Sequence, residues 1–509
     1  MTEIGQKTDP CSTIPDNKMN KDKTTEIFSS RFGIIISVLG IAVGTGNIWR
    51  FSRIVSQNDG GTFLIPWAIF LVLWSIPLII AEFAIGRYTR YGNIGSFIKL
   101  IGKKYAWMGA FIAFVATAIM FYYSVVTGWT LFYFWKALTS GLPHTHDASL
   151  SIWNLFIESN LPLMFHAIAI MFAASIVYQG VVKGIERSCK FLVPLLGIIL
   201  LIAAVRAITL PGAINGLRYL FTPDLSNLFK VEIWLNALTQ NAWDTGAGWG
   251  LILTYAAYVP RDKDTNVNAA LIGFGNNAIS LLAAIIIFST VFAILGSQAE
   301  TILKEAGPAS TGLTFIWMPQ LFAQMPGGTI LAPLFFLGLS FAAFSSLISM
   351  VELAGRILMD LGLKRKNAII TVGTVGFLAG IPSALSLGFL VNQDWVWGVA
   401  LMISGAFIAF AIVKYGEEKF RSNIVNIENS EWKVGRWWSI VIKYLIPLQV
   451  VVLLTWWLYN STKWYPDTWW HHFNLKTPET LGTCIVQWGI VIIVLFLLNK
   501  KIAKSKYNH

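Results

Sequence analysis

The sequence contains a long succession of apolar segments, each of the length that a membrane-spanning helix requires. Such a helix needs roughly 20 mostly apolar residues. Twelve segments qualify, at about 32–54, 62–86, 106–138, 162–181, 190–209, 233–258, 268–296, 328–360, 367–387, 395–414, 437–460 and 480–499. Only 13% of the residues are charged, against roughly 25% in an average soluble protein, which excludes an ordinary soluble enzyme. The sequence therefore predicts an all-α polytopic membrane protein with 12 transmembrane helices.

The basic residues between these segments predict how the chain is oriented. One set of loops is rich in Lys and Arg, for example Lys103, Lys104 and residues 364–366, whereas the alternating loops 140–161 and 388–394 contain neither. Because basic loops remain in the cytosol, we expect a multi-pass protein of the cell membrane with both termini cytoplasmic. The net charge of +12 arises from these basic loops. It indicates a lipid bilayer as partner and no nucleic acid.

Two of the apolar segments are interrupted by glycine and polar residues. The first contains the run GIAVGTGN at 40–47, and the sixth contains DTGAGWG at 244–250. Each glycine weakens a helix by roughly 1 kcal/mol relative to alanine, so both runs predict an unwound stretch. Close packing of helices through small residues is the simpler alternative. The two positions correspond if segments one to five repeat as six to ten, and such a pair points to a binding site at the middle of a transporter.

Several motifs carry a resemblance to a known family. They are Arg31-Phe-Gly, the run GIAVGTGNIWRF at 40–51 and Gly60-Gly61-Thr-Phe63. With them the sequence resembles the neurotransmitter:sodium symporter family, of the bacterial LeuT type, from about residue 31 to 499. The resemblance implies the LeuT fold, an inverted repeat of five plus five helices with helices 1 and 6 unwound. It divides the chain into a cytosolic N-terminal tail (1–31), a first repeat (32–231), a second repeat (232–414), and the last two helices with a cytosolic C-terminal tail (415–509).

The resemblance also implies two sodium sites made of oxygen ligands. The first consists of the Ala42 carbonyl, Asn47, Asp244 and Asn276, completed by the substrate carboxylate. The second consists of the carbonyls of Gly40, Val43 and Ala342 and the hydroxyls of Ser345 and Ser346. Hard oxygen ligands suit a hard cation such as Na+. Hydrogen bonding between membrane helices is the simpler explanation for each Asn or Ser taken alone.

Asp244 departs from the chloride site of related transporters, which consists of Tyr, Gln, Ser or Thr, Asn and Ser. Gln240, Asn276 and Ser280 match this pattern, but Trp67 stands at the Tyr position and Asp244 at the Ser or Thr position. A carboxylate inside the membrane is costly and normally has a partner. We expect Asp244 to supply the fixed negative charge, so that chloride is not required. Proton uptake by Asp244 on the return step and permanent pairing with sodium both remain open.

The predicted substrate follows from what stands at position 44. Amine transporters of the family carry Asp where this chain has Gly44, so an amino acid that brings its own carboxylate fits better. Tyr123 and the amides of 44–46 are placed to bind that carboxylate, and Trp243 to cover the substrate. The predicted substrate-binding residues are Ile41, Ala42, Gly44, Thr45, Gly46, Ile119, Tyr123, Trp243, Asp244, Gly246, Trp249, Ser346 and Met350. The resemblance implies sodium-coupled symport, by alternating access, of a neutral hydrophobic L-amino acid, aromatic ones included.

Two gates are implied as well. The pairs are Arg50 with Asp394 on the outside and Tyr258 with Asp360 on the inside. The N-terminal Arg that usually completes the inner gate is missing, and Lys23 or Arg31 is its candidate substitute. Glu82, inside an apolar segment, is expected to bind the freed backbone of the sixth helix.

Other functions remain to be weighed against symport. An amino-acid sensor would bind the same ligand without moving it, and a transporter of another small amine or of an osmolyte would use the same fold. A membrane-embedded enzyme is the third alternative. The sequence has no nucleophile elbow, P-loop or HExxH motif, and its three cysteines are far apart, so we expect no enzyme.

Overall fold

The computed structural model describes residues 26–305 and 311–504, which form helices joined by turns and contain no strand. The first half contains α1 (Arg31–Ala42), α2 (Thr45–Gln57), α3 (Gly61–Phe70), α4 (Ile76–Thr89), α5 (Asn93–Ile101), α6 (Ala106–Thr139), α7 (His146–Ile157), α8 (Leu161–Tyr178), α9 (Arg187–Ile208) and α10 (Ala213–Phe221). The second half contains α11 (Val231–Asp244), α12 (Leu251–Ala256), α13 (Asn266–Leu295), α14 (Ala299–Lys304), α15 (Met318–Gln324), α16 (Gly328–Asp360), α17 (Arg365–Leu385), α18 (Leu387–Tyr415), α19 (Glu417–Phe420), α20 (Arg436–Ile440), α21 (Ile446–Trp464), α22 (Leu481–Leu497) and α23 (Asn499–Ala503). Short π-helical or 3-10 segments join or extend them: η1 (Leu71–Ser75), η2 (Lys103–Tyr105), η3 (Val181–Glu186), η4 (Leu225–Phe229), η5 (Gly296–Gln298), η7 (Leu313–Trp317), η8 (Arg421–Val425) and η9 (Val441–Leu445).

Within the described ranges, nine helices are long and apolar enough to cross a membrane, and the bent pair α1 and α2 makes a tenth. The two remaining predicted spans correspond to the broken pair α11 and α12 and to α22, an apolar helix of 17 residues. The all-helical, multi-pass architecture therefore agrees with the sequence, whereas the count of twelve stays a prediction.

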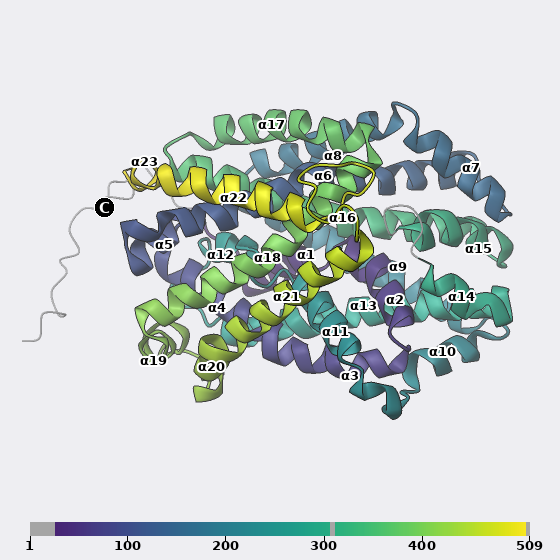
Figure 1. Cartoon of the computed structure of the whole chain (residues 1–509), viewed down its shortest axis with the longest axis horizontal. Helices are drawn as coiled ribbons and strands as arrows, with labels where there is room; N and C mark the ends of the chain where they lie inside the picture. Colours follow the sequence, from purple (N-terminus) through teal and green to yellow (C-terminus); the bar gives the residue numbers. More distant parts are fainter. Residues whose placement is uncertain (1–25, 306–310, 505–509) are drawn as a thin grey trace, which may run out of the picture.

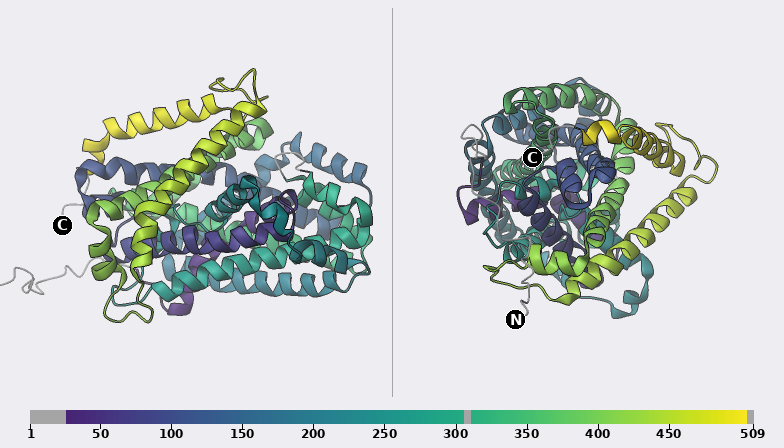
Figure 2. Two further views of the ribbon diagram at one scale, coloured as in Figure 1. Left: turned by 60° about the horizontal axis from the view of Figure 1, so that its bottom comes forward. Right: turned by 90° about the vertical axis from the view of Figure 1, so that its left-hand side faces the viewer.

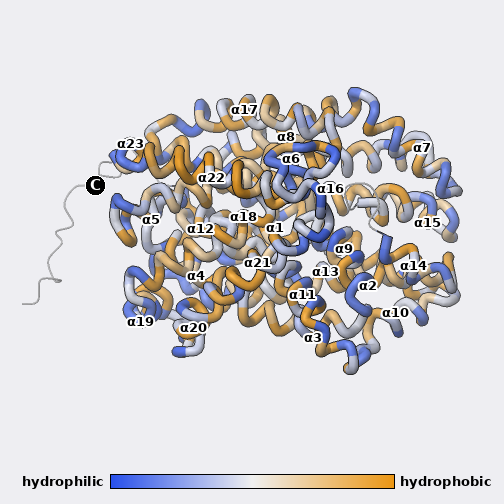
Figure 3. The backbone as a smooth tube through the Cα atoms, viewed as in Figure 1, coloured by the Kyte–Doolittle hydropathy of each residue, from blue (hydrophilic) through white to orange (hydrophobic). Residues whose placement is uncertain are grey.

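The two ends of the molecule carry different elements (Figure 1). Helices α5, α19, α20 and α23 gather at one end, and α7, α10, α14 and α15 at the other. The first end carries basic residues: Lys103 in η2, which was assigned above to the cytosolic loops, and also Lys419 in α19 and Lys500 in α23. Between the ends the helices are mainly hydrophobic (Figure 3).

Apolar side chains are exposed along the outside of the bundle, as a lipid environment requires. On α9, for example, Phe191, Ile198, Leu201 and Val205 are between 52% and 62% exposed. Their spacing of three, four and seven residues places them on one face of the helix. In the centre, α6 and α16 pack along each other, and both α1 and α12 contact α16. Figure 2 shows α21 and α22 crossing the outside of this bundle.

Both predicted interruptions are present. The axis bends by 49° between α1 and α2, where 43–44 leave the helix. Between α11 and α12 the six residues 245–250 are not α-helical. Gly246, Gly248 and Gly250 have φ of 67°, 90° and 76° there. Any residue with a Cβ is strained in this conformation, which explains why the run alternates with glycine.

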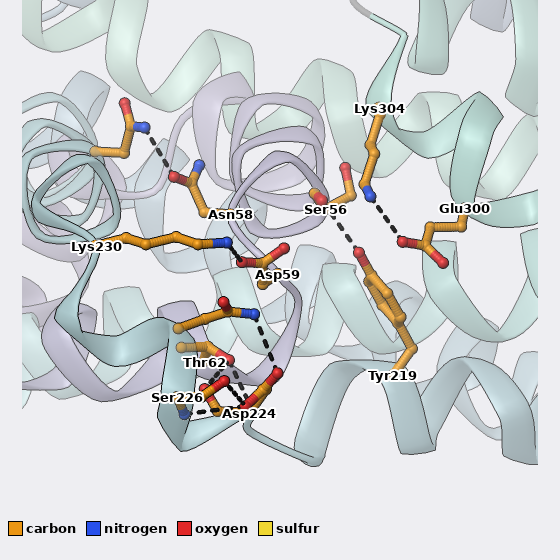
Figure 4. A network of polar contacts seen from close by, with 12 residues as sticks. Ser56, Asn58, Asp59, Thr62, Tyr219, Asp224, Ser226, Lys230, Glu300 and Lys304 are labelled. Atoms are coloured by element: carbon orange, nitrogen blue, oxygen red, sulfur yellow. Dashed lines mark hydrogen bonds and ion pairs between the residues drawn. The ribbon is translucent and has the colours of Figure 1, made fainter.

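A polar network holds the outer ends of several helices together (Figure 4). Lys230, before α11, forms an ion pair with Asp59 at 3.1 Å, and Asn236 of α11 donates to Asn58 at 2.8 Å. The hydroxyl of Tyr219 on α10 donates to the Ser56 carbonyl at 3.1 Å. These contacts join the end of α2 and the turn after it to α10 and to α11, so they hold the second half of the first broken helix in place.

One predicted loop is wrong. The sequence placed 388–394 between two spans, but these residues form the first turns of α18. The side chain of Ser386 accepts a hydrogen bond from the Phe389 amide and caps this helix. The polar run around Asn392 lies inside the helix because its side chain bonds the Pro478 carbonyl and Thr483 of the neighbouring segment. As a result, Asp394 is held on a rigid element.

Candidate functional site

The two breaks face a cavity of about 560 Å³ that extends to Gln57 at the end of α2, Glu232 at the start of α11 and Trp464 at the end of α21. Every residue predicted to bind substrate lines this cavity. The lining also includes Asn47, the outer gate residues and a rim of tryptophans on α21. The predicted residues come from five helices (α1, α2, α6, α11 and α16) and the breaks between them, and the fold brings them to one place.

One part of the cavity offers hydrogen-bond donors from the first break. The Thr45 amide and hydroxyl both lie 3.2 Å from the Tyr123 hydroxyl, and the Gly44 amide donates to Asn47 at 2.7 Å. A Cβ at Gly44 would lie 3.0 Å from the Ser346 hydroxyl and 3.1 Å from that of Tyr123. A side chain at 44 would require these hydroxyls to move by a few tenths of an ångström. The N-terminus of α2 at Thr45 lies beside the Tyr123 hydroxyl at the cavity wall, a place that favours an anionic group.

The remaining wall is apolar and aromatic. Ile41, Ile119 and Met350 are almost fully buried, and Trp249 is 8% exposed. The Trp249 indole donates to the Ala242 carbonyl at 3.1 Å, which fixes the ring against the last turn of α11. This part of the cavity suits an apolar side chain.

Oxygen atoms converge where the first sodium site was predicted. The side-chain oxygen of Asn276 lies 3.1 Å from the Ala42 carbonyl oxygen and 3.3 Å from that of Asp244. Turning the amide would place its nitrogen 2.8 Å from the amide nitrogen of Asn47, donor against donor. Asn47 is itself held by the Gly44 amide. A cation among the three oxygens satisfies all of them, so these residues fit sodium.

The second predicted site has the same surplus of acceptors. The Ser345 hydroxyl lies 3.4 Å from the Val43 carbonyl oxygen and 3.0 Å from that of Ala342. The Ser346 hydroxyl lies between 3.2 and 3.4 Å from the carbonyl oxygens of Gly40, Ile41 and Val43. The Ala342 carbonyl lies inside α16, but those of Gly40, Ile41 and Val43 lie at the C-terminal end of α1, where helix carbonyls have no intrahelical partner, and two hydroxyl protons cannot satisfy all three. This cluster, which joins α1 to α16, also fits a bound cation.

Asp244 and the residues around it lie at the end of α11. Gln240, one turn earlier, donates from its side chain to the Asp244 carboxylate. The other oxygen of that carboxylate would lie 2.9 Å from a Cβ at Gly46, so it faces the first break. Ser280 accepts from Asn47 at 2.8 Å and lies beside Asn276 on α13. Trp67 packs against Phe51 with the rings tilted by 43° and their centroids 4.6 Å apart.

Glu82 on α4 binds the second break. Its carboxylate accepts from the Gly248 amide at 2.6 Å and from the Leu253 amide at 3.0 Å. Glu82 is fully buried, so these bonds satisfy both a charge and the free amides at the start of α12. This is the contact expected from the sequence.

The outer gate pair lines the cavity without closing it. The guanidinium of Arg50 lies over the Trp243 ring, 4.2 Å from its centroid. Arg50 and Asp394 both face the cavity, which continues past them to Trp456 and Trp457.

The inner gate is assembled differently from the predicted pair. The Tyr258 hydroxyl donates to Glu352, not to Asp360, at 2.5 Å. Glu352 forms an ion pair with Arg365 at 2.5 Å, which joins α16 to the start of α17. The sequence missed both residues, although a carboxylate inside the apolar segment 328–360 was a signal of the same kind as Glu82.

Asp360 has local partners instead. Arg356, one turn earlier on α16, forms an ion pair with it at 2.9 Å, and the Gly92 amide donates to it at 2.8 Å. Asp360 therefore connects the end of α16 to the start of α5. Residues four apart on a helix lie side by side, so Arg356 is well placed to form an ion pair with Asp360.

Arg31, one of the two candidate substitutes for the missing Arg, does not complete the inner gate. Arg31 forms an ion pair with Glu431 at 2.5 Å and donates to Asn268 at 3.1 Å, and Lys23 lies outside the described residues. Phe28 instead inserts between the rings of Tyr255 and Tyr258, with centroids 6.0 and 6.4 Å away. Its amide donates to the Tyr258 carbonyl at 3.2 Å.

The sequence is similar to those of known proteins along most of the chain. The sequence profile described as the sodium:neurotransmitter symporter family matches residues 25–160 and 156–504. An uncharacterized sodium-dependent transporter of Methanocaldococcus jannaschii is 32% identical over 448 residues, which cover 84% of this chain and 89% of that protein. The sodium-dependent serotonin transporter of Drosophila melanogaster is 26% identical over 534 residues, 95% of this chain and 84% of the relative.

A solved structure is similar as well. The crystal structure of MhsT in complex with L-phenylalanine has a TM-score of 0.74 at 33% identity, and the match covers 84% of this chain and 99% of that chain. On the profile match and these relatives together, the chain belongs to the sodium:neurotransmitter symporter family.

Proposed function

We propose that the protein imports a neutral, hydrophobic L-amino acid by sodium-coupled symport, with alternating access and without a chloride requirement. Its family consists of sodium-dependent symporters, not of enzymes. The proposal places it in the cell membrane with both termini in the cytosol, because the basic loops share one end of the bundle.

One observation carries the choice of substrate. The cavity has backbone amides and the Tyr123 hydroxyl on one side and apolar side chains on the other. Position 44 is a glycine, so the chain offers no carboxylate there to bind an amine, and two hydroxyls lie 3.0 and 3.1 Å from where its Cβ would be. An α-amino acid matches both sides at once. The related MhsT was crystallised with L-phenylalanine, which supports the same class of substrate.

Two sodium ions would couple transport to the membrane gradient. The first, near Asn276, would join the first break to α11 and α13 and contact the substrate carboxylate. The second, near Ser345, would join α1 to α16. An ion that satisfies carbonyl oxygens on two elements stabilises the arrangement in which those elements are close, so sodium binding favours the occupied, outward-facing state.

Removing one sodium ligand provides a test of the second site. We expect Ser345→Ala to raise the sodium concentration for half-maximal uptake at least about tenfold, because a ligand is lost while the substrate cavity keeps its lining. Ser340→Ala is the matched control, since Ser340 lies on the same helix and bonds only the Phe336 carbonyl, at 2.8 Å. Sodium titration of uptake in proteoliposomes measures both. An unchanged half-maximal concentration in the first variant would show that Ser345 is not a ligand.

Uptake of a labelled amino-acid panel tests the proposal directly. With an inward sodium gradient we expect uptake of Leu, Met, Phe, Tyr or Trp, and with choline in place of sodium we expect none. Asp, Lys and γ-aminobutyrate should not compete, because the side-chain pocket has no charged partner for them. Sodium-dependent binding without uptake would indicate a sensor instead, and uptake that ignores sodium would refute both ion sites.

A further inference from the structure

Trp243, which covers the cavity, contacts α18 at a residue that has no side chain. A Cβ at Gly398 would lie 1.9 Å from Cη2 and 2.0 Å from Cζ2 of the Trp243 indole. Carbon atoms in ordinary contact are roughly 3.5–4.0 Å apart. The far edge of the indole therefore occupies the space that a side chain at 398 would need.

The same ring is held on a second side. The Arg50 guanidinium lies over its face at 4.2 Å from the centroid. Asp394, the other outer gate residue, is one turn before Gly398 on α18. The indole thus lies between a charged group from the first broken helix and the bare backbone of α18.

The contact at Gly398 differs from ordinary helix packing through glycine. At Gly405, two turns later on α18, an added Cβ would lie 3.4 Å from Trp74, within normal contact distance. At Gly398 the atoms in conflict belong to a cavity-lining side chain. These atoms are at the end of the indole farthest from the backbone of Trp243. The smaller ring of a phenylalanine at 243 would not extend into the space beside Gly398.

We propose that Gly398 is a positioning residue for the substrate lid, and that Gly398 and Trp243 form a size-matched pair that sets the affinity for substrate. The inference rests on the proposed function. A methyl group at 398 displaces the indole by at least about 1.5 Å, from 1.9 Å to ordinary contact distance. The displaced ring no longer lies between Arg50 and α18, and the substrate loses its cover.

The test is a double-mutant cycle on sodium-driven uptake of labelled L-phenylalanine into proteoliposomes, with KM and maximal rate measured separately. Gly398→Ala should raise KM at least tenfold. Trp243→Phe should raise it less, and the double variant should return to within threefold of Trp243→Phe. Gly405→Ala is the control on the same helix and should remain within twofold of the wild type.

Each other outcome has a distinct meaning. An unchanged KM in Gly398→Ala overturns the inference while leaving the proposed function intact. A double variant as impaired as Gly398→Ala also overturns it, because the defect then arises from helix packing. If Gly398→Ala cannot be purified as folded protein but the double variant can, that result supports the pairing. If neither variant can be purified, the pairing is refuted. If the wild type takes up no amino acid, the proposed function fails and the inference fails with it.

Discussion

Replacing Asp244 with serine should convert chloride-independent uptake into uptake that requires chloride. The substitution removes the only fixed negative charge proposed for this site and leaves the amide and hydroxyl groups of Gln240, Asn276 and Ser280 in place. A buried cation without its counter-charge costs on the order of 3–5 kcal/mol. We therefore expect uptake by Asp244→Ser to fall on the order of 100-fold when gluconate replaces chloride, and to recover with chloride.

Two comparisons make that result specific. The wild type should transport equally well in chloride and gluconate. Asp262→Ser is a control at an exposed carboxylate whose side chain is 65% accessible. Its uptake should be the same in chloride and in gluconate. Wild-type uptake that stops in gluconate would refute the assignment of Asp244 as the chloride substitute.

Replacing Glu82 with alanine should abolish transport in protein that still inserts into the membrane. Glu82 accepts from the Gly248 and Leu253 amides. A buried donor left without an acceptor costs about 1–3 kcal/mol, so the loss of two destabilises the break before α12 by several kcal/mol. We expect uptake per folded protein to fall on the order of 100-fold, together with a lower melting temperature in detergent.

A glutamine at position 82 tests whether transport depends on the size of the side chain or on its capacity to accept two hydrogen bonds. Glu82→Gln keeps the size and one acceptor but presents an NH2 group to a second N–H, so its uptake should lie between those of the wild type and Glu82→Ala. Equal activity of alanine and wild type, at equal amounts of protein that elutes as a single species, would show that the second break does not depend on this carboxylate.

The breaks and the cavity were predictable because their signals are local. Glycine beside a polar residue inside an apolar segment costs helix stability wherever it occurs, and residues 40–47 and 244–250 are conspicuous for that reason. Glu82 was identified for the same reason, as a carboxylate where lipid would otherwise be expected. The family resemblance then added the partners on α6, α13 and α16.

The charge pairs of the inner gate were not predictable in this way. Arg31 was considered for Asp360, yet it pairs with Glu431, 400 residues later in the chain. Glu352 alone was visible as a carboxylate inside an apolar segment, but its pairing with Arg365 arises because α17 turns back directly after α16, and that geometry has no local signal. The contact of Trp243 with Gly398 is of the same kind, since a close approach between two elements depends on coordinates rather than on spacing.

The three left-handed glycines between α11 and α12 limit how this protein can evolve. A single base change converts a glycine codon to Ala, Val, Ser, Cys, Arg, Trp, Glu or Asp. Of these only Asp adopts positive φ comparatively readily, and it would add a second carboxylate beside Asp244 within the membrane. Asn, the other tolerant residue, needs two base changes. Substrate preference should therefore drift through side chains such as Ile119 and Met350, while the backbone that holds the substrate remains as it is.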